Sequence, residues 1–534
     1  MQRMTVVPEK EHSIPSVKEG IPFLPLLAVI GGVFLWRVLF ATGFNLIPDE
    51  CSYWTWSRRL DWSYFDNSGM VAYLIRLSTE ILGQSTPYSV RLPFVILSGF
   101  TTYLVYTVSR LLFRNRARAL FCATLFNLVP PSLLGGAAAI HDNALIFFWL
   151  LALCAAAQYL KTNDLKCFYF MGIAAGGAIL SKYTGVLVLP CLLFFLLWNR
   201  QHRPLLLRKE PWIGALIAVV FALPILWWSY SHDWASLYHI FFIGSGAKAV
   251  SRRILDGLGY HVAQFGLVSP FFYLALIVAS VAALTRNLRE PKPEETLLLC
   301  FGMPAIIFGA MAFKGHVEAN WGFIAYPSLA ILAVETILTA RKNDAGGVWK
   351  LFSRRHLKWG LILAVGPVLV VVAHAYIGLI PAFLEKRYAK EDRIIWETRG
   401  WKDLGNHVAK YQAEGEIISA DSYQLCALLE FNIPRQPKVR YLAPWKRPTQ
   451  FDVWEPSFDN MKGRDILFVT PIPLKPSSDS LTTIYENFAA VEELPSFHVM
   501  YHRESIRNIH LYRCKNFDPF SPRRLGPRSL FYQE

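Results

Sequence analysis

Long apolar runs separated by short charged segments dominate the first 380 or so residues. A helix needs about 20 apolar residues to cross a bilayer, and about eleven runs meet or approach that length. We expect spans at 22–47, 88–113, 118–136, 142–160, 166–181, 183–199, 211–230, 261–284, 296–313, 322–340 and 359–381. The fifth and sixth are short and flank the polar Ser181–Tyr183, so short helices or a re-entrant pair are expected. The pattern predicts a mainly α, polytopic membrane protein.

The chain changes character near residue 385, where the long apolar runs stop. "GEIISA" (Gly415–Ala420), "DILFVT" (Asp465–Thr470) and "IHLYRC" (Ile509–Cys514) are typical of strands. "SYQLCALLEF" (Ser422–Phe431) has apolar residues at helical spacing, and the charged Leu384–Arg393 predicts a juxtamembrane helix. We therefore expect a transmembrane domain over 1–384 and a small α/β domain over 385–534.

Composition supports a membrane protein, because 53% of residues are hydrophobic and only 17% are charged. The net charge of +15 is typical of basic cytoplasmic loops in a polytopic protein and does not indicate nucleic-acid binding. No pair of the eight cysteines has C-x-x-C spacing, which argues against a zinc ribbon or a redox motif. Cys426 and Cys514 lie in the tail, and the sequence leaves open whether they pair. The first run lacks a cleavage site and predicts an uncleaved anchor.

The loops between spans alternate in charge. One set is rich in bases and holds Arg114, Arg116, Arg118, Lys161, Lys166, Arg200, Arg203, Arg208, Lys209, Arg286, Arg289, Lys292, Arg341, Lys342, Lys350, Arg354, Arg355 and Lys358. The positive-inside rule assigns this set to the cytoplasm. The other set contains "PDECSYW", "AIHDN", "SHDWASLYH" and "KGHVEANW", and therefore faces outward. An odd number of spans then predicts a cytoplasmic N-terminus and an outer, periplasmic tail.

Asp49 and Glu50 form the first candidate site, directly after the first span. A carboxylate there can take a proton from an attacking hydroxyl. A divalent cation is an open option, with Asp49 and Asp142 as candidate ligands. Neighbouring side chains rarely point the same way, so we expect one of the two acids to meet the substrate. A solvated loop cap is the alternative.

Basic residues near the same face predict a phosphate site. Arg58 and Arg59 lie in the first outer loop, and Lys182 lies between two apolar runs, where a lone ammonium is costly. Lys248, Arg252 and Arg253 are weaker candidates. An outward phosphate site at the membrane suits a polyprenyl-phosphate carrier, whereas contact with anionic lipid headgroups is the alternative reading of each residue.

Further candidate substrate-binding residues occur in the outer loops. They are Tyr53, Trp54, Asp66, His141, Asp142, His316, Glu318 and Asn320. Aromatic rings offer apolar faces to a sugar or an isoprenoid, and the polar groups bind hydroxyls. An aromatic belt at the membrane surface, and a helix cap at Asp142, are the plain structural alternatives.

Several motifs in order resemble one family. "DECSYWTWSRRLDWSYFDNSGMVAYLI", "SVRLPFVILSG", "HDNALIFFW", "LSKYTGVLVLP", "HDW", "VEANWGFIAYPSLAIL" and "SADSYQLCALLEFNIPRQPKVRYL" resemble bacterial membrane glycosyltransferases of the protein O-mannosyltransferase-like superfamily, which includes the aminoarabinose lipid A transferase. The resemblance covers nearly the whole chain. It implies the multispan C-type glycosyltransferase fold and transfer of a sugar from a polyprenyl-phosphate donor outside the cytoplasmic membrane.

The resemblance also implies roles for individual residues. Asp49 matches the family's catalytic acid with Glu50 as its neighbour, Asp142 matches the second-loop acid, and Lys182 matches the basic residue expected at the donor phosphate. The usual Asp-His-Pro-Pro reads Asp66-Asn67-Ser68-Gly69 here. Asn67 hydrogen-bonds but does not titrate near neutral pH, so this loop is where a distinct substrate preference is expected.

The resulting hypothesis is an inverting hexosyl- or pentosyltransferase acting on a lipid, glycan or protein acceptor, with membrane lipids around it and no nucleic acid. A lipid or sugar transporter or flippase is the rival class, which charges in the middle of spans would favour. Arg37 is the one such exception noted, and a helix-end position can explain it. A ligase would share the donor chemistry, and the sequence does not identify the sugar.

Overall fold

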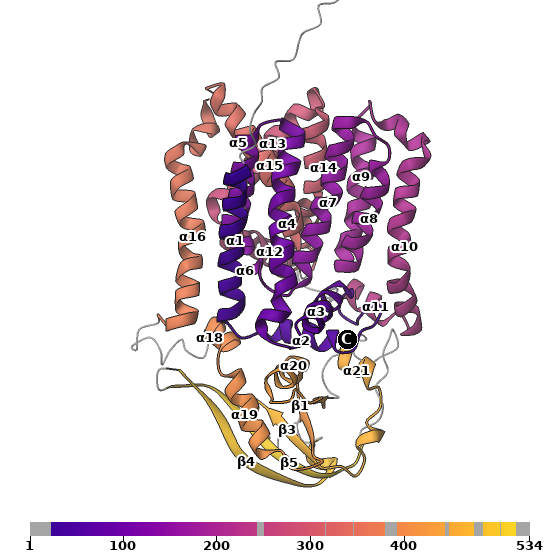
Figure 1. Cartoon of the computed structure of the whole chain (residues 1–534), viewed down its shortest axis with the longest axis vertical. Coiled ribbons are helices and arrows are strands. Elements are labelled where there is room, and N and C mark those ends of the chain that lie inside the picture. Colours follow the sequence, from indigo (N-terminus) through magenta and orange to yellow (C-terminus); the bar gives the residue numbers. More distant parts are fainter. Residues whose placement is uncertain are drawn as a thin grey trace, which may run out of the picture.

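The computed structural model describes residues 23–242, 250–315, 317–344, 346–379, 392–443, 448–474, 484–501 and 504–519. An upright bundle of helices stands over a smaller layer built around a sheet, and short helices fill the space between them (Figure 1). The prediction of a mainly helical polytopic protein with a small C-terminal α/β part is confirmed.

Eight described helices are long and apolar enough to span a bilayer. They are α1 (Phe23–Gly43), α4 (Pro87–Phe113), α7 (His141–Thr162), α10 (Lys209–Ser231), α13 (Pro270–Arg289), α14 (Pro293–Met311), α15 (Tyr326–Lys342, preceded by η3, Trp321–Ala325) and α16 (Arg354–Ile377). Shorter elements are α2 (Pro48–Ser57), α3 (Met70–Ile81), α5 (Arg116–Leu128), α6 (Pro130–Gly135), α8 (Cys167–Ser181), η1 (Tyr183–Leu187), α9 (Val188–Trp198), η2 (Arg203–Leu207), α11 (Ala235–Phe242), α12 (Val250–Val268) and η4 (Gly347–Phe352). The count of eleven spans stays a prediction.

Two predicted spans have different boundaries in the structure. The run at 118–136 is divided between α5 and α6, because Val129 precedes Pro130 and takes an extended conformation. The span predicted at 261–284 is wrong in its start: residues up to Val268 belong to α12, and Ser269, at φ 83°, turns the chain before Pro270 begins α13. Proline at the first position of a helix is favourable because its missing N–H needs no partner there.

Small residues let the helices of the bundle approach closely. A Cβ on Gly172 of α8 would lie 2.2 Å from the carbonyl oxygen of Gly214 on α10. Backbones this close gain dispersion contacts that larger side chains would prevent. This packing holds α7, α8 and α10 as one wall beside the short helices.

The C-terminal part contains α18 (Arg393–Thr398), α19 (Trp401–Tyr411), α20 (Tyr423–Asn432), α21 (Gln450–Trp454) and η5 (Asp459–Met461). Its sheet has the order β2-β1-β3-β5-β4, formed by β1 (Ile417–Ala420), β2 (Arg440–Tyr441), β3 (Ile466–Thr470), β4 (Phe488–Tyr501) and β5 (Glu504–Phe517). The strands β2, β1 and β3 are parallel, and β5 runs antiparallel to β3 and β4. The strands expected near 415–420, 465–470 and 509–514 are present, whereas the sequence analysis missed β2 and β4. Residues 384–391 of the expected juxtamembrane helix lie outside the described residues.

The two cysteines of the tail are buried and free. Cys426 belongs to α20 and Cys514 to β5, and neither forms a disulfide. Burial raises the pKa of both thiols. A raised pKa lowers the thiolate fraction at a given pH, so these thiols are poor nucleophiles.

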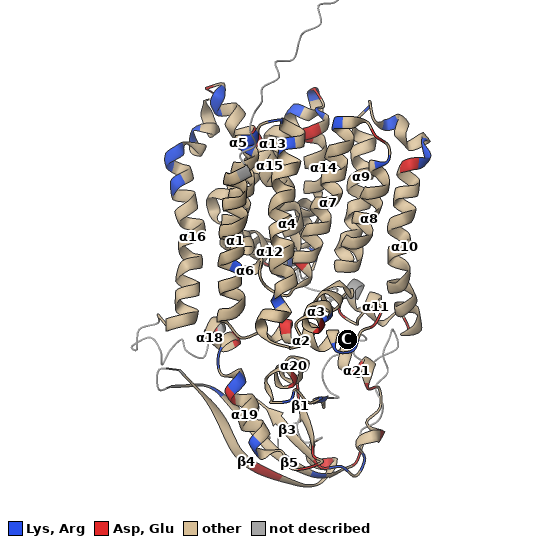
Figure 2. Ribbon diagram, viewed as in Figure 1, with Lys and Arg blue, Asp and Glu red and all other residues tan. Residues whose placement is uncertain are grey.

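Charged residues distinguish the two ends of the bundle. Figure 2 shows Lys and Arg gathered at the end far from the sheet, while the end near the sheet carries α2, α3 and α11. The structure thus separates the basic loops from the loops that hold the candidate residues.

Candidate active site

The first outer loop folds into helix α2, which begins at Pro48. Proline suits this position, and Asp49 and Glu50 in the first turn interact favourably with the positive end of the helix dipole. The carboxylate of Glu50 also accepts a hydrogen bond from the Ile47 N–H at 3.1 Å. The sequence "IPDE" therefore starts a helix directly after the first span.

Glu50 is fully buried and saturated with hydrogen bonds. It accepts from Arg91 Nε at 2.7 Å and from Arg91 Nη2 at 2.5 Å. The Ala139 N–H donates to the same carboxylate at 2.9 Å. Arg91 lies on α4 and also donates to the Phe44 carbonyl at 2.8 Å. Glu50 therefore ties α2 to α4 and to the loop before α7.

Asp49 is exposed and faces a cavity of about 650 Å³ between the bundle and the sheet. The cavity is lined by Ile47, Pro48, Asp49, Trp396, Glu397, Trp401, Ser422, Gln424, Leu425, Leu428, Pro471, Arg507 and Ile509. One of the two adjacent acids thus meets an open space and the other does not. Both walls of the space are built from segments distant in sequence.

Three contacts link the four outer loops that the sequence analysis grouped by charge. The ring of Tyr53 on α2 packs edge-on against that of His141, with centroids 4.5 Å apart. His239 Nε2 lies 3.4 Å from Asp66 Oδ1. Asn320 Nδ2 donates to Asp142 Oδ2 at 3.2 Å. The loops therefore converge on one region of the molecule.

Asp142 and Lys182 form the centre of this region. Lys182 Nζ donates to Asp142 Oδ1 at 2.9 Å, and both side chains are largely buried, at 12% and 13% exposure. The ammonium projects from the break between α8 and η1, the polar interruption seen in the sequence. Asp142 thus holds the Lys182 ammonium on one side and the Asn320 amide on the other, leaving two further donor positions on the ammonium.

Tyr53 is influenced by both Asp142 and Asp49. Burial raises the pKa of the Tyr53 phenol well above its usual value, and the nearby carboxylates of Asp49, Asp142 and Asp66 raise it further. The phenol therefore stays protonated at neutral pH and can donate a hydrogen bond. All three acids are therefore near enough to Tyr53 to act on its phenol.

His141 is buried at the start of α7, where its Nδ1 lies 3.1 Å from the Ser181 carbonyl oxygen. Its Nε2 has no partner among the described residues. The Ser181 contact joins α7 to the end of α8 beside Lys182.

Arg58 and Arg59 have a partner that the sequence did not indicate. Glu430 on α20 accepts from Arg58 Nη1 at 3.3 Å and from Arg59 Nη2 at 2.9 Å. Arg59 also lies over the Trp454 ring, 4.4 Å from its centroid. In this structure the two arginines join α2 to the C-terminal part, and neither belongs to the Lys182 cluster.

Trp54 has a packing role in this interface. It is 1% exposed and packs edge-on against Phe431, with centroids 5.0 Å apart. Burial lowers the pKa of the neighbouring Arg58, and Glu430 opposes that shift. The hydrophobic contact and the ion pairs together seat α20 on α2.

The loop that departs from the family pattern is folded tightly. Ser63 and Ser68 form an isolated antiparallel bridge, and the Tyr64 N–H donates to the Asn67 carbonyl at 3.0 Å. Ser68 Oγ donates to the Ile179 carbonyl at 2.9 Å. This last bond fixes the loop against α8.

The remaining candidates lie at the edge of the site or outside the described residues. Glu318 is exposed, and Arg252 pairs with Asp256 at 3.3 Å within α12. Lys248 and His316 lie outside the described residues. Arg37 is buried in α1 and donates to Asn127 Oδ1 at 3.0 Å, so this intramembrane charge ties helices together.

A metal centre is not evident in the described part of the chain. No group of three or more His, Cys, Asp or Glu side chains is placed to hold one ion there. Asp49 and Asp142, the two candidate ligands, face different partners: Asp49 the cavity, and Asp142 the Lys182 ammonium.

Sequence reasoning missed three charged residues that the structure makes important. They are Arg91, Glu430 and Arg507. Arg91 had a signal, because a single arginine inside the apolar "SVRLPFVIL" run needs a partner. Glu430 and Arg507 occur in a mixed-charge tail, where a charged residue carries no such signal.

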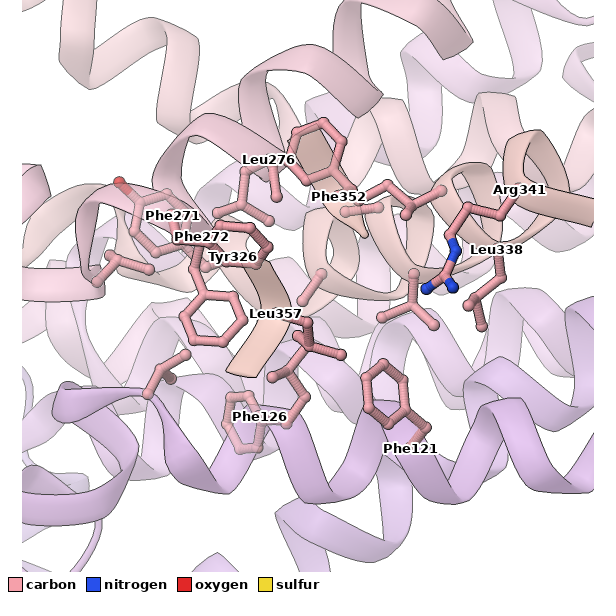
Figure 3. Close-up of a pocket in the computed structure, with 18 of the residues that line it drawn as sticks. Phe121, Phe126, Phe271, Phe272, Leu276, Tyr326, Leu338, Arg341, Phe352 and Leu357 are labelled. Carbon is pink, nitrogen blue, oxygen red and sulfur yellow. The ribbon is translucent and has the colours of Figure 1, made fainter. Parts of the chain in front are cut away.

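An apolar cavity lies elsewhere, between α5, α13, α15 and α16. Figure 3 shows its lining, where Phe121, Phe126, Phe271 and Leu276 are typical and Arg341 supplies the charged side chain. It carries no carboxylate, so it offers no general base. The acids that converge near Tyr53 belong to a separate region.

Comparison with known proteins supports the family resemblance seen in the sequence. The family model for dolichyl-phosphate-mannose-protein mannosyltransferase matches residues 66–228. Lipid A galacturonosyltransferase RgtD of Rhizobium johnstonii is 29% identical over 313 residues, 58% of this chain and 64% of that protein. These matches support the resemblance to the protein O-mannosyltransferase-like superfamily. A second relative, the undecaprenyl phosphate-alpha-4-amino-4-deoxy-L-arabinose arabinosyl transferase of Pectobacterium carotovorum, is 24% identical over 62% of this chain.

The superfamily's C-type fold is also confirmed by a solved structure. ArnT from Cupriavidus metallidurans, bound to undecaprenyl phosphate, has a TM-score of 0.60 and 13% identity, over 91% of this chain and 97% of that one. At this identity the likeness concerns the fold. The chain spans 64% and 62% of the lengths of the two curated relatives above.

Proposed function

We propose that this protein is an inverting glycosyltransferase that moves a sugar from a polyprenyl-phosphate donor to an acceptor at the outer face of the membrane. The observation that carries the proposal is the placement of Asp49, an exposed carboxylate on the wall of a large cavity. Asp49 and Asp142 both act on the Tyr53 phenol, and Asp142 holds the Lys182 ammonium. A base and a cation in one region suit attack on a phosphate-linked sugar.

In this proposal each charged residue has one task. Asp49 takes the proton of the acceptor hydroxyl as its oxygen attacks the anomeric carbon. The bond from that carbon to the phosphate oxygen breaks through an oxocarbenium-like transition state. Lys182, oriented by Asp142, stabilises the charge on the departing polyprenyl phosphate. Holding both substrates in one space supplies much of the rate.

The relatives support this class of reaction. One is named for transferring galacturonic acid to lipid A, and another for transferring aminoarabinose from undecaprenyl phosphate. We therefore propose a lipid or glycan acceptor of the cell envelope, with a protein acceptor as the less favoured option.

We further propose the arrangement in the cell. The protein is placed in the bacterial cytoplasmic membrane, with its basic end in the cytoplasm and its sheet in the periplasm, as the positive-inside rule favours. The transmembrane domain ends near residue 384, and residues 385–534 form the extracytoplasmic domain.

The test is Asp49→Asn in the purified full chain, assayed with a panel of undecaprenyl-phosphate-linked sugars and lipid A as the acceptor. Loss of a general base is expected to lower kcat by about 10²- to 10⁴-fold. Asp459→Asn, an exposed acid on η5, is the matched control and should keep wild-type activity. Wild-type turnover by the Asp49 variant would contradict the assignment.

A second variant in the same assay tests the donor side. Lys182→Gln removes one cation from the leaving phosphate and is expected to lower kcat/KM for the donor by about 10²- to 10³-fold. An unchanged kcat/KM would remove Lys182 from the mechanism. If the wild-type protein transfers no sugar but carries the lipid-linked sugar across vesicle bilayers, a transporter replaces the whole proposal.

A further inference from the structure

Arg507 is a buried charge on the wall of the cavity that Asp49 faces. It lies on β5, its side chain is 3% exposed, and it lines the cavity opposite the outer end of the first span. The proposed reaction assigns it no role. A buried guanidinium beside an open space needs an explanation, because an unpaired charge in a protein interior is costly.

Only part of the hydrogen-bonding capacity of the guanidinium is used within the described residues. Its Nη2 donates to the Trp396 carbonyl, while Nε and Nη1 have no hydrogen-bond partner among the described residues. Arg513, six positions along the same strand, shows the usual arrangement. Its Nε donates to Glu416 at 3.0 Å and its Nη2 to the Tyr411 carbonyl at 2.7 Å. Arg507 therefore has two buried donor nitrogens without a partner in the described part of the chain.

Two tryptophans hold the guanidinium in place. Its central carbon lies 4.1 Å from the ring centroid of Trp396 and 3.8 Å from that of Trp401. Faces of aromatic rings stabilise a cation and restrict its orientation. Burial lowers the pKa of Arg507 to about 9, so the side chain keeps its charge at neutral pH. The rings thus fix a cation without neutralising it.

The cavity lies where a membrane-anchored molecule can reach it. A second cavity of about 720 Å³ borders the same α18–α19 segment and is lined by Thr398, Arg399 and Gly400. It extends to Phe44 and Tyr376, at the ends of the first and last spans, α1 and α16. A headgroup between the sheet and the bundle can therefore remain attached to chains in the bilayer.

We propose that Arg507, held between Trp396 and Trp401, binds a phosphate or carboxylate on the headgroup of a membrane-anchored acceptor whose hydroxyl reaches Asp49. This inference rests on the proposed function, since it treats the cavity as the acceptor side of that reaction. An anion at this guanidinium would accept a charge-assisted hydrogen bond, which is stronger than one between neutral groups. Arg507 is then a specificity residue, distant from the bond that breaks.

The test measures binding without any donor. Full-length protein in detergent is titrated with lipid A carrying both phosphates, with the same lipid A after enzymatic removal of the phosphates, and with a glucuronosyl diacylglycerol. We expect wild-type protein to bind an anionic glycolipid about 10- to 100-fold more tightly than the neutral lipid, as one charge-assisted contact provides. Comparing the affinities for phosphorylated lipid A and for the glucuronosyl lipid shows whether Arg507 binds a phosphate or a carboxylate.

Variants then test whether Arg507 causes the preference for anionic lipid. Arg507→Gln should abolish the preference for the anionic lipid, and Arg507→Lys should restore part of it. Lys402→Gln, an exposed cation on neighbouring α19, removes the same net charge and should leave the preference intact. All three variants should bind undecaprenyl phosphate as tightly as the wild type does. An unfolded variant would lose this affinity as well.

Several outcomes would overturn the inference. The inference fails if the wild-type protein binds anionic and neutral glycolipids equally well. It also fails if the preference for the anionic lipid persists in Arg507→Gln. Equal binding of phosphatidylglycerol would show a site for any anionic lipid and overturn the acceptor role. If the preference depends on Arg507 while no donor supports transfer, the anion site stands and the proposed transferase function fails.

Discussion

Adjacent Asp49 and Glu50 occupy opposite environments within one turn of helix. Successive side chains on a helix point about 100° apart. Glu50 therefore turns into the bundle and meets Arg91, while Asp49 turns to the cavity. The buried pair positions the exposed acid, because it fixes the start of α2 to α4. One carboxylate is thus structural, and the other lines the cavity in which the reaction is proposed.

Glu50→Ala is expected to destabilise the protein by about 3–5 kcal/mol, because Arg91 would be left as an uncompensated buried charge. Unfolding of the purified protein in detergent, followed by circular dichroism, measures the change. The control is Glu80→Ala, which removes an exposed partner of Arg76 on α3 and should cost less than about 1 kcal/mol. Equal melting of the two variants would contradict a structural role for the Glu50–Arg91 pair.

At the scale of elements, helix α2 is the connection between the membrane bundle and the sheet. Glu50 lies in its first turn, and Arg58 and Arg59, just after its last residue, meet Glu430 on α20. The Val439 N–H also donates to Glu430 at 3.0 Å, which ties this carboxylate to the loop before β2. The cavity that holds Asp49 and Arg507 exists because these contacts seat α20 and the sheet against α2.

Glu430→Ala is expected to loosen this interface while leaving the bundle folded. It removes the acceptor of both arginines and of the Val439 N–H, at a cost of about 3–5 kcal/mol. Hydrogen exchange should become faster over α20, β1 and β2, with no change in α7 and α8. Glu455→Ala, which removes the partner of Arg440 within the C-terminal part, is the control. Protection of α20 equal to that of the wild type would show that the ion pairs do not hold the interface.

At the scale of the whole molecule, the basic loops and the sheet lie at opposite ends of the bundle. Basic side chains gather at the end of the bundle away from the sheet, and the acids near Tyr53 lie at the other end (Figure 2). In the proposed reaction, a phosphate-linked sugar on a polyprenyl chain would meet the second end from within the bilayer. The candidate catalytic and binding residues therefore lie at one end of the molecule.

The orientation can be tested with two single cysteines. Lys462→Cys lies in the C-terminal part and Lys161→Cys at the end of α7, and both positions are exposed. A membrane-impermeant maleimide applied to intact spheroplasts should label Lys462→Cys and should label Lys161→Cys only after lysis. The native Cys426 and Cys514 thiols are buried and should give little background. The reverse labelling pattern would invert the topology.

The sequence determined most of the spans, the polarity of the loops and the strands β1, β3 and β5. These features depend on local rules, because each span must be apolar along its length and each buried strand must be apolar within a few residues. The same local reasoning failed at residues 261–268, where α12 continues an apolar pattern but turns away at Ser269. It also singled out Asp49, Asp142 and Lys182, since each stands next to an apolar run.

Only the tertiary structure decided which charges act together. Arg59 and Glu430 are 371 residues apart, and nothing near either residue indicates the other. Arg507 likewise becomes notable only when β5 places it beside Trp396, Trp401 and the cavity of Asp49. The physical reason is that the energy of a charge depends on its burial and its partners, which the docking of distant segments sets.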